Sequence, residues 1–432
     1  MSTRGRHHVA AFVVASLLAA MLPPFPPAAG ASISVATPSV TLRSVAMLDE
    51  TIAVAVATNG TVWRTTSAGN DWTQVRTADS YDLRAVDFWN TSSGVAVAYS
   101  GKAIRSVDGG FTWTNIDFSP FLDMDGDAAE YSHHAVACAP GTTSIAVSVG
   151  GDPAITDATW IGPIAMRTQN SLSNWKQPLF SAKAHLYNDG VGNLYPVGEG
   201  EFLDIDFVDS LNGWAAGRDT YTDATKASNT GAVYRTTDGG VSWAMLTTTL
   251  TSTLNAVAFG STTAGVIAGQ LVAGGAPRVF YTTNGGTSWV QGTLPTGTGV
   301  PRALHMTSAT TGWLVGDGGT LLRTTNGGAT WTACTKPTGF ASALYDVKLI
   351  GTKGIAVGSS AVLMTDDGIT WYRPDPTPPT ISALWSTSHP QEASWYSALA
   401  MTALWSASDS SGVAGYAVAL DQSPTTAPEA VV

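Results

Sequence analysis

The sequence predicts an all-β fold whose main part is a seven-bladed β-propeller of four-stranded antiparallel blades. An eight-residue motif that ends in tryptophan occurs seven times, and successive motif tryptophans lie 41, 62, 68, 46, 42 and 40 residues apart. Each repeat carries four short β-branched or apolar runs separated by Gly, Asn and Ser, as is typical of strands joined by turns. Seven such units fit the range of about four to eight blades in propellers.

The second repeat illustrates the expected blade. Its four strands are predicted at residues 85–88, 94–98, 102–105 and 112–116. The motif tryptophans, five in clear copies and two in degenerate ones, are Trp113, Trp243, Trp289, Trp331 and Trp371, and Trp72 and Trp175.

The eight-residue motif is predicted to be a structural turn between the third and fourth strands. Its third residue, Asp or Asn, can accept hydrogen bonds from turn amides, its glycines permit positive φ, and its tryptophan packs against the neighbouring sheet. Because Asp and Asn replace each other among the copies, a catalytic role for this residue is not expected. The arginines that precede the motif are attributed to the repeat architecture: Arg64, Arg105, Arg167, Arg235 and Arg323.

The motif S/T-x-D-x-G-x-T/S-W resembles the Asp-box (BNR) repeat of sialidase-type propellers. The longer unit, in which Gly312-Trp-Leu-Val-Gly316 precedes Arg-Thr-Thr-Asn-Gly-Gly, resembles most the photosystem II stability/assembly-factor type repeat. The resemblance covers roughly residues 40–373 and implies the propeller fold. It leaves function open, since such repeats serve lyases, hydrolases, receptors and assembly factors.

Residues 1–31 have the layout of a secretory signal peptide. Arg4 and Arg6 precede an apolar run from Val9 to Leu22, and Ala29-Gly30-Ala31 offers a small-residue cleavage site. The run is shorter than the about 20 residues of a membrane span, so an uncleaved anchor is the less favoured alternative. No later segment approaches that length, and we expect an exported protein, secreted or at the cell surface, without a transmembrane segment after cleavage.

The propeller is expected over residues 32–373, followed by a proline-rich linker at 374–380. Residues 381–432 resemble part of an immunoglobulin-like or fibronectin-like module of bacterial surface proteins. Such a sandwich needs about 100 residues, so we expect a truncated β-sandwich module there, with a short disordered tail as the alternative.

The two cysteines exclude a disulfide scaffold and a cysteine-rich metal site. Cys138 and Cys334 fall three blades apart in the repeat map, so two separate thiols are expected.

The acidic residues are concentrated in one part of the chain. The net charge is −11, and residues 117–223 hold 15 acidic and four basic residues, while the rest of the chain is neutral. Without a positive excess, nucleic-acid binding is not expected. The same stretch contains the extra length of the third and fourth repeats, near residues 119–134, 150–163, 181–202 and 218–230. All four insertions are predicted to project from one propeller face, opposite to the eight-residue turns; we call this surface the acidic loop face.

The acidic loop face contains weak signals for a metal ion. Asp123-Met-Asp-Gly-Asp127 and Glu130 resemble the start of a calcium loop, but Ala128 stands where that loop has Gly and His134 where it has Glu. A solvated acidic loop is the alternative. His133 and His134 could also join carboxylates in a transition-metal site, although adjacent strand residues point to opposite sides. The candidate calcium ligands are Asp123, Asp125, Asp127 and Glu130.

One residue of each repeat is predicted to open the innermost strand and to surround the channel mouth on the same face. In chain order these seven residues are Arg43, Arg84, His134, Leu203, Asn255, Arg302 and Tyr345. Three arginines and a histidine can grip an anion or carboxylate, so Arg43, Arg84, His134, Arg302 and Tyr345 are the predicted ligand-binding set. Alternatively, the arginines pair with nearby acids such as Asp82 or Asp87.

Three functions are consistent with these features. The first is a secreted or cell-surface, monomeric, non-catalytic propeller that binds a protein or glycan partner through the acidic loop face. The second is a glycoside hydrolase that uses two carboxylates, with Asp125, Glu130, Asp152, Glu199 and Glu201 as candidates. The sialidase motif Phe/Tyr-Arg-Ile-Pro is replaced by Leu42-Arg-Ser-Val45. The third, implied by the resemblance, is an assembly factor for a membrane complex.

Overall fold

The computed structural model describes most of the propeller and two strands beyond it. The described residues are 34–35, 37–99, 101–116, 132–151, 164–168, 175–176, 179–180, 185–188, 194–197, 200–219, 230–246, 250, 252–271, 275–374, 380–386 and 403–408. All of them belong to the unit that spans residues 32–432.

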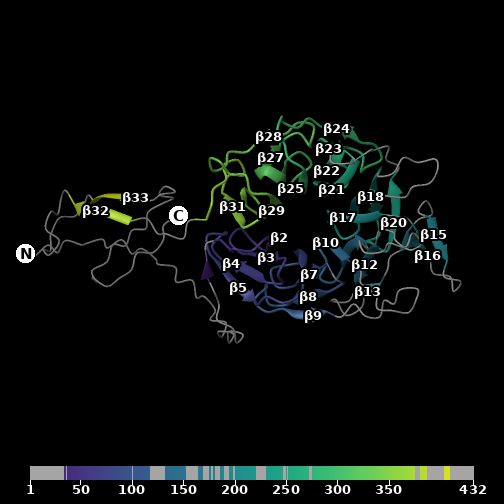
Figure 1. Ribbon diagram of the computed structural model, residues 1–432, viewed down its shortest axis with the longest axis horizontal. Helices are drawn as coiled ribbons and strands as arrows, with labels where there is room; N and C mark the ends of the chain where they lie inside the picture. The colour runs from purple at the N-terminus through teal and green to yellow at the C-terminus, as the bar shows by residue number, and fades with distance from the viewer. Residues whose placement is uncertain are drawn as a thin grey trace, which may run out of the picture. The chain divides into compact units, whose positions relative to one another are not determined.

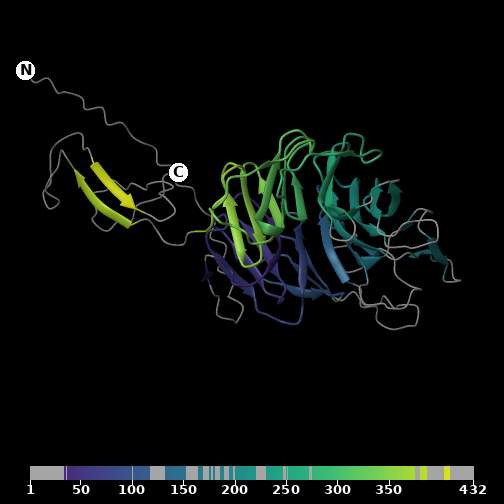
Figure 2. The same ribbon diagram turned by 45° about the horizontal axis from the view of Figure 1, so that its top comes forward.

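Seven sheets, built around antiparallel four-stranded blades, follow one another in chain order around a ring, which confirms the predicted seven-bladed propeller (Figure 1). Within each sheet, the strands run outward from the channel in sequence order. In the turned view of Figure 2, strands of neighbouring blades stand side by side.

The first four blades have these strands, from the channel outward. Blade 1 contains β2 (Leu42–Met47), β3 (Ala53–Ala57), β4 (Val62–Thr65) and β5 (Trp72–Arg76), with β1 (Ser34–Val35) added at its outer edge. Blade 2 contains β6 (Leu83–Phe88), β7 (Gly94–Ala98), β8 (Ala103–Ser106) and β9 (Thr114–Ile116). Blade 3 contains β10 (Ser132–Cys138), β11 (Ala146–Gly151), β12 (Ile164–Thr168) and β13 (Trp175–Lys176). Blade 4 contains β17 (Gly200–Phe207), β18 (Gly213–Asp219), β19 (Thr230–Thr236) and β20 (Ser242–Leu246), with β14 (Leu179–Phe180) outside.

The last three blades complete the ring. Blade 5 contains β21 (Ser252–Phe259), β22 (Gly265–Leu271), β23 (Pro277–Thr282) and β24 (Val290–Gln291). Blade 6 contains β25 (Pro301–Met306), β26 (Gly312–Gly316), β27 (Thr320–Thr324) and β28 (Thr332–Ala333), with the short 3-10 helix η1 (Asp317–Gly319) between β26 and β27. Blade 7 contains β29 (Leu344–Ile350), β30 (Lys353–Gly358) and β31 (Ala361–Thr365), and a bridge from Met364 to Tyr372 takes the outermost place.

Two hairpins lie outside the blades: β15 (His185–Asn188) with β16 (Leu194–Val197), and β32 (Thr380–Ser386) with β33 (Ala403–Ser408). The second hairpin falls in the region expected to be a truncated β-sandwich, which stays a prediction. No helix in the described part of the chain is long and apolar enough to cross a membrane. Cys138 and Cys334 are both buried and free, as the repeat map predicted.

The core of the propeller lies between blades. In the described residues, seven apolar clusters each combine side chains from two adjacent blades. The second strand of each blade is covered on both faces, which explains runs such as the fully buried Ala-Val-Ala-Val-Ala of β3. The cluster between blades 7 and 1 joins Val45 and Trp72 to Val357 and Met364, so the ring closes by the same kind of packing.

The eight-residue turn has the structural role that its composition predicts. In blade 4, Thr236 Oγ1 accepts the amide of Gly240, and the Asp238 carboxylate accepts the amide and hydroxyl of Ser242. Trp243 is buried at 1% exposure. Arg167, which precedes the eight-residue turn of blade 3, donates from Nε to the Gly239 carbonyl in the turn of blade 4. This arginine therefore links one blade to the next.

Each innermost strand carries a β-bulge at the same place. The register between the first and second strands shifts around one residue in every blade. The residues inside these shifts are the seven predicted mouth residues: Arg43, Arg84, His134, Leu203, Asn255, Arg302 and Tyr345. Because a bulge re-aims a side chain, this repeated irregularity sets the directions of the side chains at the mouth.

Candidate functional site: the channel and its mouth

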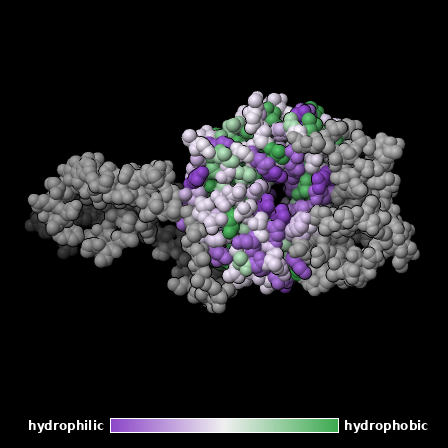
Figure 3. All heavy atoms as spheres, in the orientation of Figure 1, coloured by the Kyte–Doolittle hydropathy of each residue, from purple (hydrophilic) through white to green (hydrophobic). Residues whose placement is uncertain are grey.

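A cavity of about 600 Å³ follows the innermost strands through the ring. One end is lined by the bulge residues, and the other by residues that follow the innermost strands, such as Pro140 and Gly141. Figure 3 shows the opening at the centre of the ring with hydrophilic residues at its border. All seven predicted mouth residues line this cavity, while their ligand-binding role stays a prediction.

Two of the three mouth arginines have acidic partners nearby. Arg84 Nη2 lies 2.6 Å from Asp82 Oδ2. Arg302 forms a two-pronged pair with Asp317, through Nε at 3.0 Å and Nη2 at 2.8 Å. For these two arginines, the alternative of pairing with local acids is correct, although Asp87 is not among the partners.

Arg43 differs from the other two arginines. Its guanidinium lies over the ring of Tyr345, 4.7 Å from the ring centroid. Its buried Nε has no hydrogen-bond partner, as is also true of Arg84 Nε, but unlike Arg84 and Arg302, Arg43 has no carboxylate within ion-pair distance among the described residues. Burial lowers the pKa of Arg43, and the nearby charge of Arg84 lowers it further. Arg43 is therefore a cation at the mouth that forms no ion pair among the described residues, and Asp82 acts on it only at longer range.

Glu201 connects His134 to Arg218 at the edge of the mouth. Its carboxylate lies 3.0 Å from His134 Nε2 and 2.8 Å from Arg218 Nη2. Burial by itself raises the pKa of Glu201, but the contacts with His134 and Arg218 outweigh it and leave the pKa below its ordinary value. Glu201 is thus held as a carboxylate, which suits an ion pair better than a general acid.

The other candidate carboxylates of the acidic loop face lie outside the described residues: Asp123, Asp125, Asp127, Glu130, Asp152 and Glu199. The strand ends that flank them are described. Ser132 of β10 pairs with Gly151 of β11, and Gly200 of β17 pairs with Asp219 of β18. These paired ends lie beside the bulges at His134 and Leu203, so the insertions leave the blades at the mouth end of the channel.

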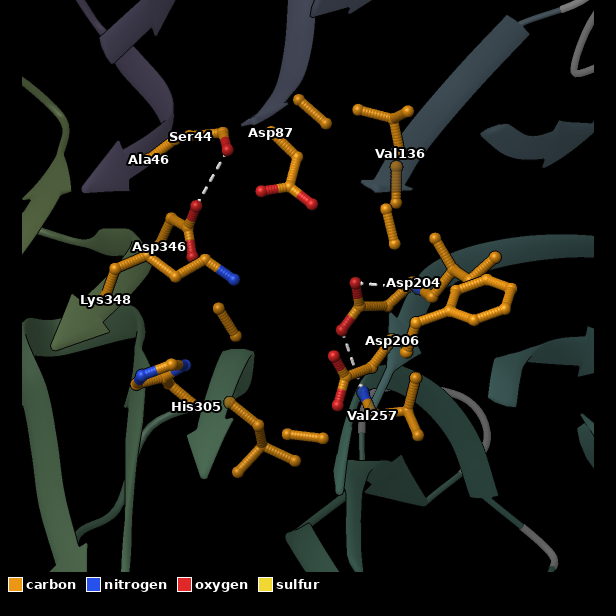
Figure 4. Close-up of a pocket in the computed structure, with 18 of the residues that line it drawn as sticks. Ser44, Ala46, Asp87, Val136, Asp204, Asp206, Val257, His305, Asp346 and Lys348 are labelled. Atoms are coloured by element: carbon orange, nitrogen blue, oxygen red, sulfur yellow. Dashed lines mark hydrogen bonds between the residues drawn. The ribbon is translucent and has the colours of Figure 1, made fainter. Parts of the chain in front are cut away.

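Below the mouth, alternate residues of the innermost strands point into the channel (Figure 4). The layer next to the bulges contains Ser44, Asp204 and Asp346, and the layer beyond it contains Asp87, Asp206, His305 and Lys348. None of these channel positions was predicted from the sequence. The sequence nevertheless contains the pairs Asp204 and Asp206, and Asp346 and Lys348. Each pair is two residues apart, so its side chains share one face of an innermost strand.

Each channel aspartate accepts a backbone amide from the following blade. Asp87 accepts from Cys138 at 2.7 Å, Asp204 from Val257 at 2.8 Å, and Asp206 from Phe259 at 2.7 Å. Asp346 closes the ring by accepting the amide of Val45 at 3.0 Å and the hydroxyl of Ser44 at 2.8 Å. The innermost strands have no neighbouring strand on the channel side, so backbone groups there need other partners. The aspartates accept hydrogen bonds from some of these amides.

Burial and neighbouring charges shift the pKa values of the titratable groups in the channel. Burial raises the pKa of Asp204 to about 7 and that of Asp87 to about 6, and it also raises the pKa of Asp206. Burial alone lowers the pKa of Lys348, but the four aspartates outweigh this effect and raise it above its ordinary value. Burial lowers the pKa of His305 to about 3, and its Nε2 lies 3.1 Å from the Leu349 carbonyl.

The described residues contain no group of three or more His, Cys, Asp or Glu side chains that could hold a metal ion. The candidate calcium ligands lie outside the described residues, so calcium stays a prediction. The described arrangement is a channel mouth with three arginines, of which Arg43 forms no ion pair, above a channel with more carboxylates than ammonium groups.

Residues 286–378 match the sequence family described as photosynthesis system II assembly factor YCF48. This match confirms the resemblance to that repeat, which the sequence analysis based on the motif copies. No curated protein matches this chain in sequence.

Solved structures share the fold. A structure described as YCF48 bound to D1 peptide is 18% identical, with a TM-score of 0.52 over 79% of this chain and 97% of that one. YCF48 from Cyanidioschyzon merolae is 18% identical, with a TM-score of 0.51 over 78% and 99%. A GH74 xyloglucanase from Xanthomonas campestris is 14% identical, with a TM-score of 0.51 over 82% of this chain and 57% of that one. At these identities, the likeness is one of fold.

Proposed function

We propose that this chain is a non-catalytic binding propeller whose channel mouth takes a carboxylate of a protein partner. The observation that carries the proposal is Arg43, a partly buried guanidinium that lies over Tyr345 and has no acidic partner among the described residues. Arginine binds carboxylates through two parallel N–H donors, and burial strengthens such bonds. A carboxylate from a partner would supply the acceptors that the surrounding fold does not.

Two observations favour a protein over a glycan as the partner. The family match is to an assembly factor, and one propeller of the same fold has been solved with a peptide, as its description states. We therefore propose an assembly-factor or adaptor role, in which the acidic loop face beside the mouth contacts basic parts of the same partner. Glu201, the described candidate carboxylate of that face, lies at the mouth, where it contacts His134.

We further propose that the protein is exported, as a secreted or surface-held monomer. The basis is the sequence layout of residues 1–31, which lie outside the described residues.

Glycoside hydrolysis is the less favoured function. A hydrolase needs one carboxyl group that is protonated at working pH and faces a second across a cleft. Among the five candidate carboxylates, Glu201 is the one within the described residues, and its contacts with His134 and Arg218 favour the ionised form.

The experiment is a pair of arrays, one of peptides with free carboxyl termini or acidic side chains and one of glycans. They are probed with wild type, Arg43→Ala and Arg278→Ala; Arg278 is a control arginine on β23 of blade 5, away from the channel. We expect peptide binding that Arg43→Ala abolishes and Arg278→Ala leaves unchanged. Binding restricted to glycans and insensitive to Arg43, or turnover of chromogenic glycosides, would overturn the proposal.

A further inference from the structure

The channel below the mouth holds more negative than positive charge. Four aspartates and one lysine line it: Asp87, Asp204, Asp206, Asp346 and Lys348. Figure 4 shows Lys348 directed into the cavity from one side and Asp204 and Asp206 from the other. Among the described residues, no carboxylate lies within ion-pair distance of the Lys348 ammonium, although all four aspartates act on it at longer range and raise its pKa.

The size of the channel cavity favours an organic cation over a metal ion. The cavity of about 600 Å³ has the volume of roughly 20 water molecules. The aspartates come from three different blades, and no three of the described acidic or histidine side chains converge closely enough to hold a metal. A flexible ammonium group on an alkyl stem can reach such separated carboxylates, because it carries three donors and needs no fixed coordination geometry.

The distances along the strands fit a side chain that enters from the mouth. Asp204 follows the bulge residue Leu203 directly, and Asp206 lies three residues beyond that bulge residue. At about 3.3 Å per residue, these carboxylates lie about 3 and 10 Å below the mouth. A lysine side chain with its backbone at the mouth is long enough to place its ammonium group between these two depths.

The arginines at the mouth do not strongly repel an incoming ammonium group. Asp82 and Asp317 balance the charges of Arg84 and Arg302. The remaining charge, that of Arg43, would be balanced by the carboxylate that we propose it binds. A peptide segment that carries both a carboxylate and an ammonium group therefore matches Arg43 at the mouth and the aspartates in the channel below it.

We propose that the channel receives a lysine side chain of the partner, whose ammonium group binds Asp204 and Asp206 while the carboxylate of the same terminal residue binds Arg43. This inference rests on the proposed function and specifies its ligand as a peptide that ends in lysine. The bound ammonium would offset part of the negative charge of the channel aspartates. The raised pKa of Asp204 adds a measurable consequence, because bound ammonium favours the ionised form and binding near pH 7 releases a proton.

The test is calorimetric titration with the peptide Ala-Ala-Ala-Lys with a free carboxyl terminus. The matched peptides replace lysine with norleucine, which lacks the ammonium, or amidate the terminus. For wild type, we expect roughly tenfold weaker binding of the norleucine peptide, in line with the loss of a charge-assisted hydrogen bond. Titrations in buffers of different ionisation enthalpy should show proton release with the lysine peptide and none with norleucine.

The variants separate this inference from the proposed function. Asp204→Asn should bind the lysine peptide about as weakly as the norleucine peptide, with norleucine binding unchanged, whereas Arg43→Ala should weaken both. Asp206→Asn serves as a second channel variant, and circular dichroism checks that each variant is folded. Equal affinity of wild type for the lysine and norleucine peptides overturns the inference and leaves the proposed function standing. Absence of binding for every free-terminus peptide overturns both.

Discussion

The channel carboxylates make a specific prediction about stability and pH, and Asp204→Asn tests it. Asparagine has the shape of the protonated carboxyl group and keeps an oxygen that can accept the Val257 amide, which Asp204 accepts at 2.8 Å. The change therefore removes the negative charge while retaining the bond to the next blade. In the folded chain, burial raises the pKa of Asp204 from 3.8 to about 7.

The sign of the effect follows from where the proton is bound. Below about pH 4, both the folded and unfolded chains carry it; between about pH 4 and 7, only the folded chain does. The free energy of unfolding of the wild type therefore falls as pH rises through this window, by about 1.4 kcal/mol for each pH unit. Between pH 5 and 8, the accumulated loss is about 3 kcal/mol as an upper value, and Asp204→Asn does not suffer it.

The assay is urea denaturation of wild type and variant at pH 5 and pH 8. We expect the stability of the variant relative to wild type to rise between pH 5 and pH 8, by up to about 3 kcal/mol. Asp209→Asn is the control, since hydrogen bonds from Asn212 and Leu211 outweigh burial and lower the pKa of Asp209, so its effect should be the same at both pH values. If the difference between Asp204→Asn and wild type does not change between pH 5 and 8, the account of the channel charges is wrong.

Three substitutions test the packing of the ring. Asp346→Ala leaves the Val45 amide without its acceptor and should lower the free energy of unfolding by about 1–3 kcal/mol, with faster hydrogen exchange at Val45; unchanged exchange there would contradict its role in closing the ring. Trp214→Leu removes a ring stacked 3.6 Å from that of Phe259 and should lower the melting temperature by several degrees, whereas an unchanged melting temperature would contradict the seam packing. Gly240→Ala forces a Cβ onto a backbone with φ of +81° and should cost about 1 kcal/mol or more in urea denaturation; a neutral result would show that the turn can relax.

Repetition made the fold predictable. One tryptophan-terminated turn per blade gave the blade number and the order of strands, and alignment of the copies placed seven residues at the channel mouth. The β-bulge at each of these positions was not visible in the sequence, because it depends on how two strands pair. It nevertheless occurs at the aligned residue in all seven blades, such as Arg43 and Arg84.

The pairing of the mouth arginines depends on neighbours that only the fold brings together. Asp82 stands two residues before Arg84, a pair that the sequence already suggested, whereas the corresponding position before Arg43 is Thr41. Asp317 reaches Arg302 from the end of the adjacent strand, a partner that spacing along the chain does not reveal.

The channel aspartates were missed for a physical reason. In an isolated strand, alternating Asp residues indicate a solvent-exposed face, and this is how Asp204 and Asp206 entered the count of acidic residues. Ring closure turns that face inward, where burial raises the pKa of both carboxyl groups. Lys348, which faces them from the seventh blade, is separated from them by about 140 residues of sequence.

The most direct test of the central claim is the NMR signal of the Arg43 Nε–H group during titration with a free-terminus peptide. This buried donor has no partner in the described structure, and Arg323 Nε, also buried and unpartnered but remote from the channel, is an internal control. We predict that the Arg43 signal moves downfield and exchanges more slowly with water as peptide binds, while the Arg323 signal stays in place. A peptide that binds with the Arg43 signal unchanged would contradict the claim that the channel mouth is the binding site.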